Sequence, residues 1–507
     1  MNTSRRRLAA VAASASVLLG LTACSPAAQT ASGGAPTADG TLVYGVIGTA
    51  SDDLSPWSMT SSTSTQMLHY ELYDTLTASK PDGTTVMALA ESMTPNADAT
   101  EWTVKLRPDI ALHDGGTFTS DDVIESLTRL LDSDPKLPGA KLIPFVDKNR
   151  LTKVDDLTLT IGLTSSFALL PDIFANLRLL MAHWDGDEPV GTGAFTVDSF
   201  TANEQAKLVR FDDYWGTKPG FENLTIQYFA SQEAITNALR GGQIDVAASV
   251  PFTDVPSLES AGGITILTSE SNQAPTISFR VDTAPFDDPR VVQALKLLVD
   301  RDKIVTNAYG GYADVGNDWF GPGAGCPAPD VAQRTYDVEA AKKLLAEAGH
   351  PDLSFELTTD GGYGGMMESA QLFAQDAAEA GVTVTINKLD NASFLAKWGE
   401  WPAFMGIIGG NYASVSANYY LPEQSNNSTH FDNADYTSLY TTLVSTTDEA
   451  ERCSTVNAMQ TIDYEYQGSI IPAWPQTLVA HRDTVTGLQP DLYSRSSYLF
   501  GGVTVSK

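Results

Sequence analysis

The sequence predicts a mixed α/β protein made of about three domain-sized units. Its 507 residues exceed what a single hydrophobic core usually accommodates. Hydrophobic residues make up 42% and aromatic residues 9% of the chain, which is typical of a folded globular protein and not of a disordered or fibrous one. Short strand-like segments alternate with amphipathic helical segments along the chain, and this alternation indicates the α/β class.

The first elements are expected in the first quarter of the chain. The alternating, β-rich segment 41–46 predicts a strand that ends at the turn-forming cluster 52–56. Apolar residues at helical spacing follow over 67–76, and a second strand is expected over 101–106. N-capping residues at the start of 119–131 precede apolar positions at helical spacing, so a helix is expected there.

The second half of the chain repeats this mixture. Segment 288–299 begins with Asp and Pro and continues as an amphipathic helix. A second helix is expected over 337–348, with Gly349 in the position that ends a helix. Short strands are expected over 353–358 and 382–386. These elements predict another unit of alternating strands and helices.

The N-terminus has the layout of an export signal followed by a lipid-attachment site. Three arginines at 5–7 precede an apolar stretch, 8–21, that is too short to span a bilayer. The next residues, Leu-Thr-Ala-Cys ending at Cys24, resemble the lipobox of bacterial lipoproteins, whose cysteine is acylated and becomes the new N-terminus. We therefore expect 1–23 to be a lipoprotein signal peptide and 24–40 to be a flexible tether, rich in small residues and poor in charge.

Two alternatives remain open for this region. Cleavage elsewhere would leave Cys24 as an incidental thiol. The residues at 4–8 also resemble a twin-arginine signal, so the twin-arginine and general secretory routes are both compatible with the sequence. In either case we expect an extracytoplasmic protein. Acyl chains on Cys24 would anchor it to the cell membrane, because each buried CH2 group contributes about 0.8 kcal/mol.

Composition and motifs exclude several classes of function. The formal net charge of −31 argues against nucleic acid as a partner, because phosphate binding needs a concentrated positive surface. The six histidines are scattered, so no clustered metal site is expected. The sequence has no G-x-S-x-G elbow, H-E-x-x-H helix or phosphate-binding glycine loop. We expect no catalytic residue, no metal and no cofactor.

Nine short motifs follow one another along the chain. They include LAESM at 89–93, GTGAF at 191–195 and PFDDPRV at 285–291. The others lie at 102–115, 119–123, 213–216, 238–245, 300–304 and 336–349. In this order they resemble the motifs of the family 5 solute-binding proteins of ABC importers, the class that binds peptides, nickel and opines. Each motif alone also has a structural explanation, such as a tight turn or a helix start.

The resemblance implies an α/β, two-lobed periplasmic-binding-protein-like fold of type II, with an extra domain in the first lobe and a hinge that closes on the ligand. The first lobe is expected to comprise 41–275 and 479–507, with the extra subdomain at about 63–187. The second lobe is expected to comprise 276–478.

The function implied is that of a solute receptor, not an enzyme. Such a receptor is a monomer that captures a peptide or peptide-like molecule between its lobes and delivers it to a membrane permease driven by ATPase subunits. An oligosaccharide or another non-peptide solute is an alternative ligand. A receptor that signals or adheres without feeding a transporter is a second alternative, and a secreted hydrolase is a distant third.

Two segments are expected to contact the ligand. In peptide-binding members, the segment after the first turn pairs with the ligand backbone; here it contains Thr60, Ser61 and Ser62, which could instead form a polar surface loop. A later aspartate pairs with the ligand's α-amino group, but this chain has Asn411 there, followed by Tyr412. Asparagine carries no charge. Either another acid binds the amine, or the ligand is not a free-amine peptide.

Two tryptophans and two cysteines complete the candidate residues. Trp401 and Trp474 could stack on a ligand, although tryptophan is equally common in hydrophobic cores. If Cys24 is acylated, Cys326 and Cys453 remain, and they could form a disulfide or stay as buried thiols.

Overall fold

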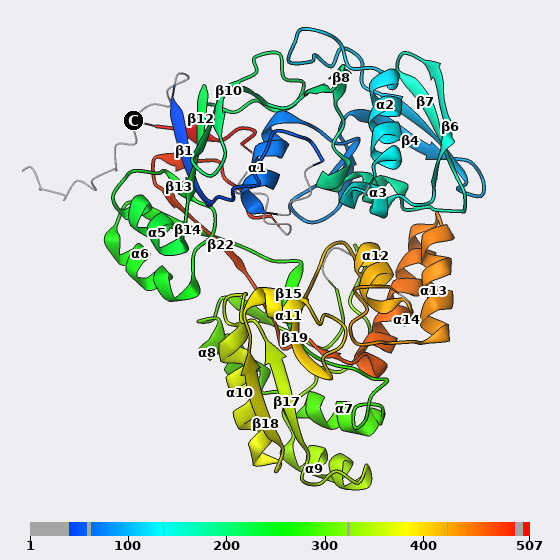
Figure 1. The fold of residues 1–507 in the computed structure, drawn as a ribbon, viewed down its shortest axis with the longest axis vertical. Coiled ribbons are helices and arrows are strands. Elements are labelled where there is room, and N and C mark those ends of the chain that lie inside the picture. Colours follow the sequence, from blue (N-terminus) through cyan, green and yellow to red (C-terminus); the bar gives the residue numbers. More distant parts are fainter. Residues whose placement is uncertain are drawn as a thin grey trace, which may run out of the picture.

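Two lobes lie one above the other in the computed structural model, which describes residues 40–57, 62–134, 136–321, 325–422, 424–491 and 500–506 (Figure 1). The first lobe, at the top in this view, contains a seven-stranded sheet and a separate four-stranded sheet. The second lobe contains a five-stranded sheet. This arrangement confirms the expected two-lobed α/β fold with an extra unit in the first lobe.

The seven-stranded sheet is the base of the first lobe. In spatial order its strands are β10 (Phe195–Thr201), β11 (Gln205–Arg210), β12 (Asn223–Phe229), β1 (Thr41–Ile47), β13 (Val246–Ala247), β22 (Thr477–Arg482) and β14 (Ile264–Ser269). Leu42, Tyr44 and Val46 alternate along β1 and pack against α1 (Thr63–Leu72). Helices α5 (Gln232–Arg240) and α6 (Val255–Ala261) cover the opposite face. Successive residues of β1 thus face two different cores, one on each side of the sheet.

The extra unit is a four-stranded antiparallel sheet covered by helix α2 (Ser120–Asp132). Its strands are β4 (Ala90–Pro95), β5 (Glu101–Leu106), β7 (Thr158–Leu163) and β6 (Val146–Asp155). The helix begins after Thr119, whose backbone N–H donates to Asp122 Oδ2 at 2.6 Å. The expected strand at 101–106 and the expected helix at 119–131 are therefore confirmed.

Short elements connect these two sheets. They comprise β2 (Thr77–Ser79), β3 (Thr85–Met87), α3 (Pro138–Leu142), α4 (Leu170–Phe174), the 3-10 helix η1 (Leu177–Leu179), β8 (His183–Asp185) and β9 (Glu188–Val190). The pair β23 (Val485–Thr486) and β24 (Thr504–Val505) closes the C-terminal end. Val485 and Val505 pack into the core beneath the seven-stranded sheet, so this end of the chain belongs to the first lobe.

The five-stranded sheet organises the second lobe. In spatial order its strands are β18 (Thr383–Lys388), β17 (Ser354–Thr359), β19 (Ala403–Gly409), β15 (Gln273–Phe279) and β20 (Ser469–Ile470). The helices of this lobe are α7 (Pro289–Leu297), α8 (Arg301–Ala308), α9 (Val338–Glu347), α10 (Met366–Glu379), α11 (Asn391–Leu395), α12 (Tyr412–Val415), α13 (Ala434–Ser445) and α14 (Glu449–Tyr466). Asp337 caps α9 by accepting from the Ala340 N–H, and Gly349 follows with φ at +83°, as the sequence predicts.

One predicted element ends earlier than expected. The apolar spacing over 67–76 suggested a helix through Leu76, but α1 ends at Leu72 and Tyr73 is extended. Leu76 is fully buried in a different core, beneath the extra unit. Its spacing therefore reflects burial in two adjacent cores and not one continuous helical face.

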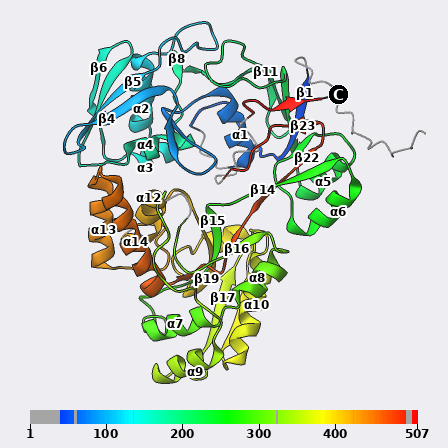
Figure 2. The same ribbon diagram turned by 180° about the vertical axis from the view of Figure 1, so that it is seen from behind.

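The chain crosses between the lobes at two places, which Figures 1 and 2 both show. One passage lies between β14, which ends at Ser269, and β15, which begins at Gln273. The other lies between β21 (Ala473–Pro475), paired with β16 (Ala313–Val315) in the second lobe, and β22 in the first lobe. The expected boundaries at 275/276 and 478/479 lie a few residues after these passages.

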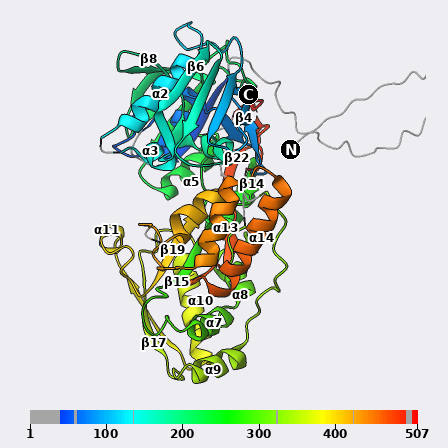
Figure 3. The ribbon, with the colours of Figure 1, turned by 90° about the vertical axis from the view of Figure 1, so that its right-hand side faces the viewer.

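The lobes also touch away from these passages. Helices α13 and α14 extend up to the extra unit of the first lobe (Figures 1 and 3). The Ala168 N–H donates a hydrogen bond to the Val444 carbonyl at 2.5 Å. Side chains of both lobes, including Leu169 and Leu443, belong to one buried cluster. The structure is therefore closed on this side.

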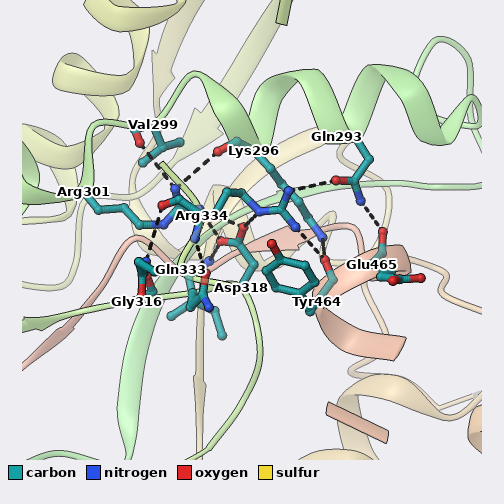
Figure 4. Close-up of polar contacts among 12 residues, drawn as sticks. Gln293, Lys296, Val299, Arg301, Gly316, Asp318, Gln333, Arg334, Tyr464 and Glu465 are labelled. Carbon is teal, nitrogen blue, oxygen red and sulfur yellow. Dashed lines mark hydrogen bonds and ion pairs between the residues drawn. The ribbon is translucent and has the colours of Figure 1, made fainter. Parts of the chain in front are cut away.

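A buried ion cluster connects four segments of the second lobe (Figure 4). The Asp318 carboxylate is 1% exposed and accepts two hydrogen bonds from Arg301, both at 2.7 Å. It also accepts from the Ile471 backbone N–H at 3.1 Å, and Arg334 Nε lies 2.9 Å from it. The Arg334 guanidinium also donates a hydrogen bond to the Tyr464 carbonyl on α14 at 3.0 Å. The cluster thus fixes Asp318 and Arg334 against α8 and α14.

Lys296 on α7 lies beside this cluster and is fully buried. Its ammonium donates to the Tyr464 carbonyl at 2.9 Å. Burial lowers the pKa of Lys296 to about 7; the charges of Asp318 and Asp463 oppose this shift, and those of Arg334 and Arg301 add to it. Burial also raises the pKa of the Asp463 carboxyl on α14 well above its ordinary value.

Replacement of Lys296 by methionine is expected to remove a pH dependence of stability. The pKa of lysine in an unfolded chain is about 10.4. Between pH 7 and this pKa, the unfolded chain therefore binds a proton at Lys296 that the folded chain lacks. The free energy of unfolding therefore gains about 1.4 kcal/mol per pH unit from this residue as the pH rises. Urea unfolding at pH 7.5, 8.5 and 9.5 should show this gain in the wild type relative to Lys296→Met.

Lys343→Met is the matched control, because Lys343 is exposed on α9, 3.9 Å from Glu347. Its unfolding free energy should run parallel to that of the wild type over this pH range. A Lys296→Met curve that also runs parallel would contradict the assigned pKa.

Candidate ligand-binding site

Two adjoining cavities lie between the lobes. The first has a volume of about 300 Å³ and the second of about 560 Å³, and both are lined by residues of both lobes. Three residues line both cavities: Ser79 and Asp172 from the first lobe and Asn411 from the second. These residues mark the junction of the two cavities, and the volumes are in the range of small-molecule sites.

The first cavity lies between α1 and the ends of two second-lobe strands. Gln66 and His69 project from α1, and Arg178 lies on η1. The opposite wall is Gln273 at the start of β15 and Gly409 at the end of β19, which are paired in the sheet. His69 Nε2 is 2.9 Å from the Asp53 carbonyl, so its ring is held by a hydrogen bond within the first lobe.

The second cavity lies between the extra unit and α14. Its first-lobe wall includes Thr85 and Asp172, and its second-lobe wall includes Arg452 on α14. Cys326 and Cys453 also line it, and the structure joins them in a disulfide. This bond ties the segment that carries Cys326 to α14, and both sulfur-bearing residues form part of the cavity wall.

Asp172 is the acidic group at the junction. It lies in the first turn of α4, half-buried, and accepts a short hydrogen bond from the Thr85 hydroxyl. Burial raises the pKa of the Asp172 carboxyl, while the Thr85 hydrogen bond and the positive charge of Arg452 act in the opposite direction. Within the described parts of the chain, no ion pair joins Asp172 to a basic residue. The carboxylate therefore faces the cavities without a charged partner in contact.

Asn411 lies opposite, where β19 passes into α12. It is the N-cap of α12, and its Oδ1 accepts from the Ser414 N–H at 2.9 Å. Gly410 precedes it with φ at +140°, and its carbonyl accepts from Asn272 Nδ2 at 3.1 Å. Because the amide oxygen is used as the cap, Asn411 offers the cavities its amide N–H groups, which are hydrogen-bond donors.

The structure separates the expected contact residues into three groups. Asn411 lines both cavities, and Tyr412 lines the second, although Tyr412 is only 3% exposed and packs against Phe320. Trp401 and Trp474 line neither cavity. Trp401 donates to the Phe394 carbonyl at 3.1 Å and stacks on that ring. Trp474 packs on Phe320 and lines a separate cavity within the second lobe. Both tryptophans therefore have the packing roles that were the alternative to ligand contact.

Of the expected segment at 60–62, only Ser62 belongs to the described residues; Thr60 and Ser61 lie outside them, as does Cys24. Ser62 caps α1 by accepting from the Thr65 N–H at 3.3 Å, and its hydroxyl donates to Asp52 at 3.0 Å. Asp52 also accepts from the Thr49 and Thr65 hydroxyls. Although burial opposes the change, these hydrogen bonds lower the pKa of Asp52. The carboxylate holds both ends of the loop between β1 and α1.

Sequence reasoning missed Asp172, Arg178 and Arg452. No motif surrounds them, and Arg452 lies far along the chain from Asp172 and Arg178, which are close together in the sequence. Only the approach of α4, η1 and α14 brings them to one cleft.

Two further tests concern metals and membranes. The described residues contain no group of three or more His, Cys, Asp or Glu side chains that could hold a metal ion. Of the helices within the described ranges, none combines the length and the apolar character needed to cross a membrane.

Comparison with known proteins places this site in a family. Residues 84–430 match the model of the bacterial extracellular solute-binding proteins, family 5. The glutathione-binding protein GsiB of Pectobacterium atrosepticum is 27% identical over 362 residues, which are 68% of each chain. GsiB of Escherichia coli K12 is 26% identical over 437 residues, 80% of this chain and 83% of its own.

A solved structure shares the fold. The substrate-binding protein CtaP of Listeria monocytogenes superposes with a TM-score of 0.81 at 22% identity, over 92% of this chain and all of its own. The family match extends over more than half of the sequence, and the two-lobed fold and interlobe cavities agree with it. The chain belongs to family 5 of the bacterial extracellular solute-binding proteins.

Proposed function

We propose that this protein is the lipid-anchored receptor of an ABC importer, that it captures a peptide-like small molecule between its lobes, and that it delivers this molecule to the membrane permease. One observation carries the proposal: two joined cavities have walls from both lobes and meet at Ser79, Asp172 and Asn411. A ligand at this junction contacts both lobes and stabilises the closed arrangement. The closed lobes then present the surface that a permease recognises, and no chemical reaction is needed.

The lining favours a peptide over an oligosaccharide. Groups of both charges, Asp172, Arg178 and Arg452, face the cavities, which suits a molecule with ammonium and carboxylate groups. Sugar sites generally use open aromatic faces, but Trp57 and Trp102 in these walls are only 8% and 3% exposed. Relatives that share about a quarter of the residues are named glutathione-binding proteins, and glutathione is a tripeptide.

The membrane anchor is the second part of the proposal. Its support is the sequence: a basic start, a short apolar stretch and the lipobox-like residues that end at Cys24. The acyl chains would keep the receptor next to its permease, and residues 24–40 would allow the lobes to reach it. A monomer is sufficient for this role, because one chain supplies both walls of the cleft.

Binding of free-amine peptides should stabilise the protein. The mature chain is unfolded to release any bound molecule, refolded, and tested by thermal shift with reduced glutathione, trialanine and maltotriose. A ligand at 100 times its dissociation constant adds about 2.7 kcal/mol of stability, so the melting temperature should rise with at least one peptide. A rise with maltotriose and with neither peptide would contradict peptide binding.

The anchor is tested at Cys24. In cells labelled with a palmitate analogue, the wild-type chain should carry the label and sediment with membranes, because the cysteine is the acceptor of the acyl chains. Cys24→Ser should lose the label and appear in the soluble extracytoplasmic fraction. Equal labelling of both chains would contradict lipidation at this residue, and the Cys326→Ser, Cys453→Ser double variant serves as the thiol control.

A further inference from the structure

Ionisable groups lie at three different points of the cleft. Asp172 is at the junction, Arg178 lines only the first cavity, and Arg452 lines only the second. Arg178 is exposed, and its guanidinium has no hydrogen bond or ion pair with any described residue. Arg452 uses one guanidinium nitrogen to bind the Thr447 carbonyl at 3.0 Å, which leaves its other N–H groups without a described partner. Asp172 therefore lies between two positive groups, and the exposed carboxylate of Glu449 also lines the second cavity.

The acidic group suits an ammonium ion. Thr85 binds one carboxylate oxygen of Asp172, and the other oxygen has no hydrogen bond with a described residue. A half-buried carboxylate without a charged partner is unfavourable, so a cationic group that enters the cleft gains a strong, charge-assisted hydrogen bond there. Asn411, on the opposite wall, is neutral and cannot give an ammonium a charge-assisted hydrogen bond.

The two arginines suit carboxylates. Each guanidinium can bind a carboxylate through two parallel hydrogen bonds, and each lies on a different side of Asp172. His69 and Glu449 also line the cavities. His69 is held by the Asp53 carbonyl, and Glu449, which is exposed near Arg452, makes no ion pair with it. The arrangement matches a ligand with one ammonium and two carboxylates better than a ligand with a single carboxylate.

We infer that the cleft selects short peptides that carry one free ammonium and two carboxylates, with Asp172 holding the ammonium and Arg178 and Arg452 each holding one carboxylate. This inference rests on the proposed function, because it requires a peptide at the junction of the cavities. Asp172, which would bind the ligand's amine, belongs to the first lobe, whereas Asn411 belongs to the second-lobe wall. Reduced glutathione is the probe that has these three groups.

The first test uses the wild-type protein alone and measures dissociation constants by titration calorimetry. Reduced glutathione should bind at least about 30-fold more tightly than its N-acetyl derivative, which lacks the ammonium. It should bind about 10-fold more tightly than its glycine amide, which lacks one carboxylate, and more tightly than trialanine. Equal affinity for glutathione and N-acetylglutathione would overturn the role of Asp172 without any variant.

The second test uses variants that each remove one charge. Asp172→Asn should weaken glutathione binding about 30-fold or more and should remove the preference for the free amine. Arg178→Met and Arg452→Met should each weaken glutathione binding about 10-fold, and one of them should leave the affinity for the glycine amide unchanged. Glu451→Gln, exposed on the same helix α14 but outside both cavity linings, is the matched control and should stay within about twofold of the wild type.

The outcomes separate this inference from the proposed function. If trialanine and N-acetylglutathione bind as tightly as glutathione, and Asp172→Asn binds like the wild type, peptide capture stands and the inference is wrong. If no peptide binds and maltotriose does, both proposals are wrong. Circular dichroism and the melting temperature verify the fold of each variant, and the ligand series on the wild type gives a result even where a variant does not fold.

Discussion

The second-lobe wall of the cleft depends on the buried carboxylate of Asp318. This group joins two arginines and the Ile471 backbone N–H, and through Arg334 it also reaches α14. Helix α14, which Arg334 binds, carries Arg452 and Cys453 of the second cavity. Loss of one member of a buried ion pair costs about 3–5 kcal/mol, because the remaining charge stays buried without a partner. The position of the cavity wall thus depends on an interaction that lies outside both cavity linings.

Much of the fold could be predicted because its signals are local. A few adjacent residues indicate the start, the period or the end of three elements. These are the strand at 101–106, the helix capped by Thr119 and the helix between Asp337 and Gly349. The helix at 67–76 was predicted too long, because Leu76 keeps the apolar spacing while it packs into another core. Periodicity reports burial, and burial can pass from one core to the next without a change in spacing.

The site could be predicted only where a family motif marks it. Asn411 lines both cavities as expected, whereas Trp401 and Trp474 pack on Phe394 and Phe320. An aromatic residue carries the same sequence signal in a core and in a binding wall. Asp172 is one acidic residue among 62, and nothing near it in the chain indicates that it faces α14 across a cleft. Such a residue can be recognised as part of the cleft only from the arrangement of the two lobes.

Whether the disulfide between Cys326 and Cys453 forms depends on the redox conditions of the compartment in which the protein lies. The disulfide lies in the wall of the second cavity, so that wall is complete only where thiols are oxidised. In a reducing compartment this bond is absent, and the wall of the second cavity then depends on the remaining contacts of α14. Under the proposed function, the last covalent step in building the cleft coincides with arrival in an oxidising compartment outside the cytoplasm.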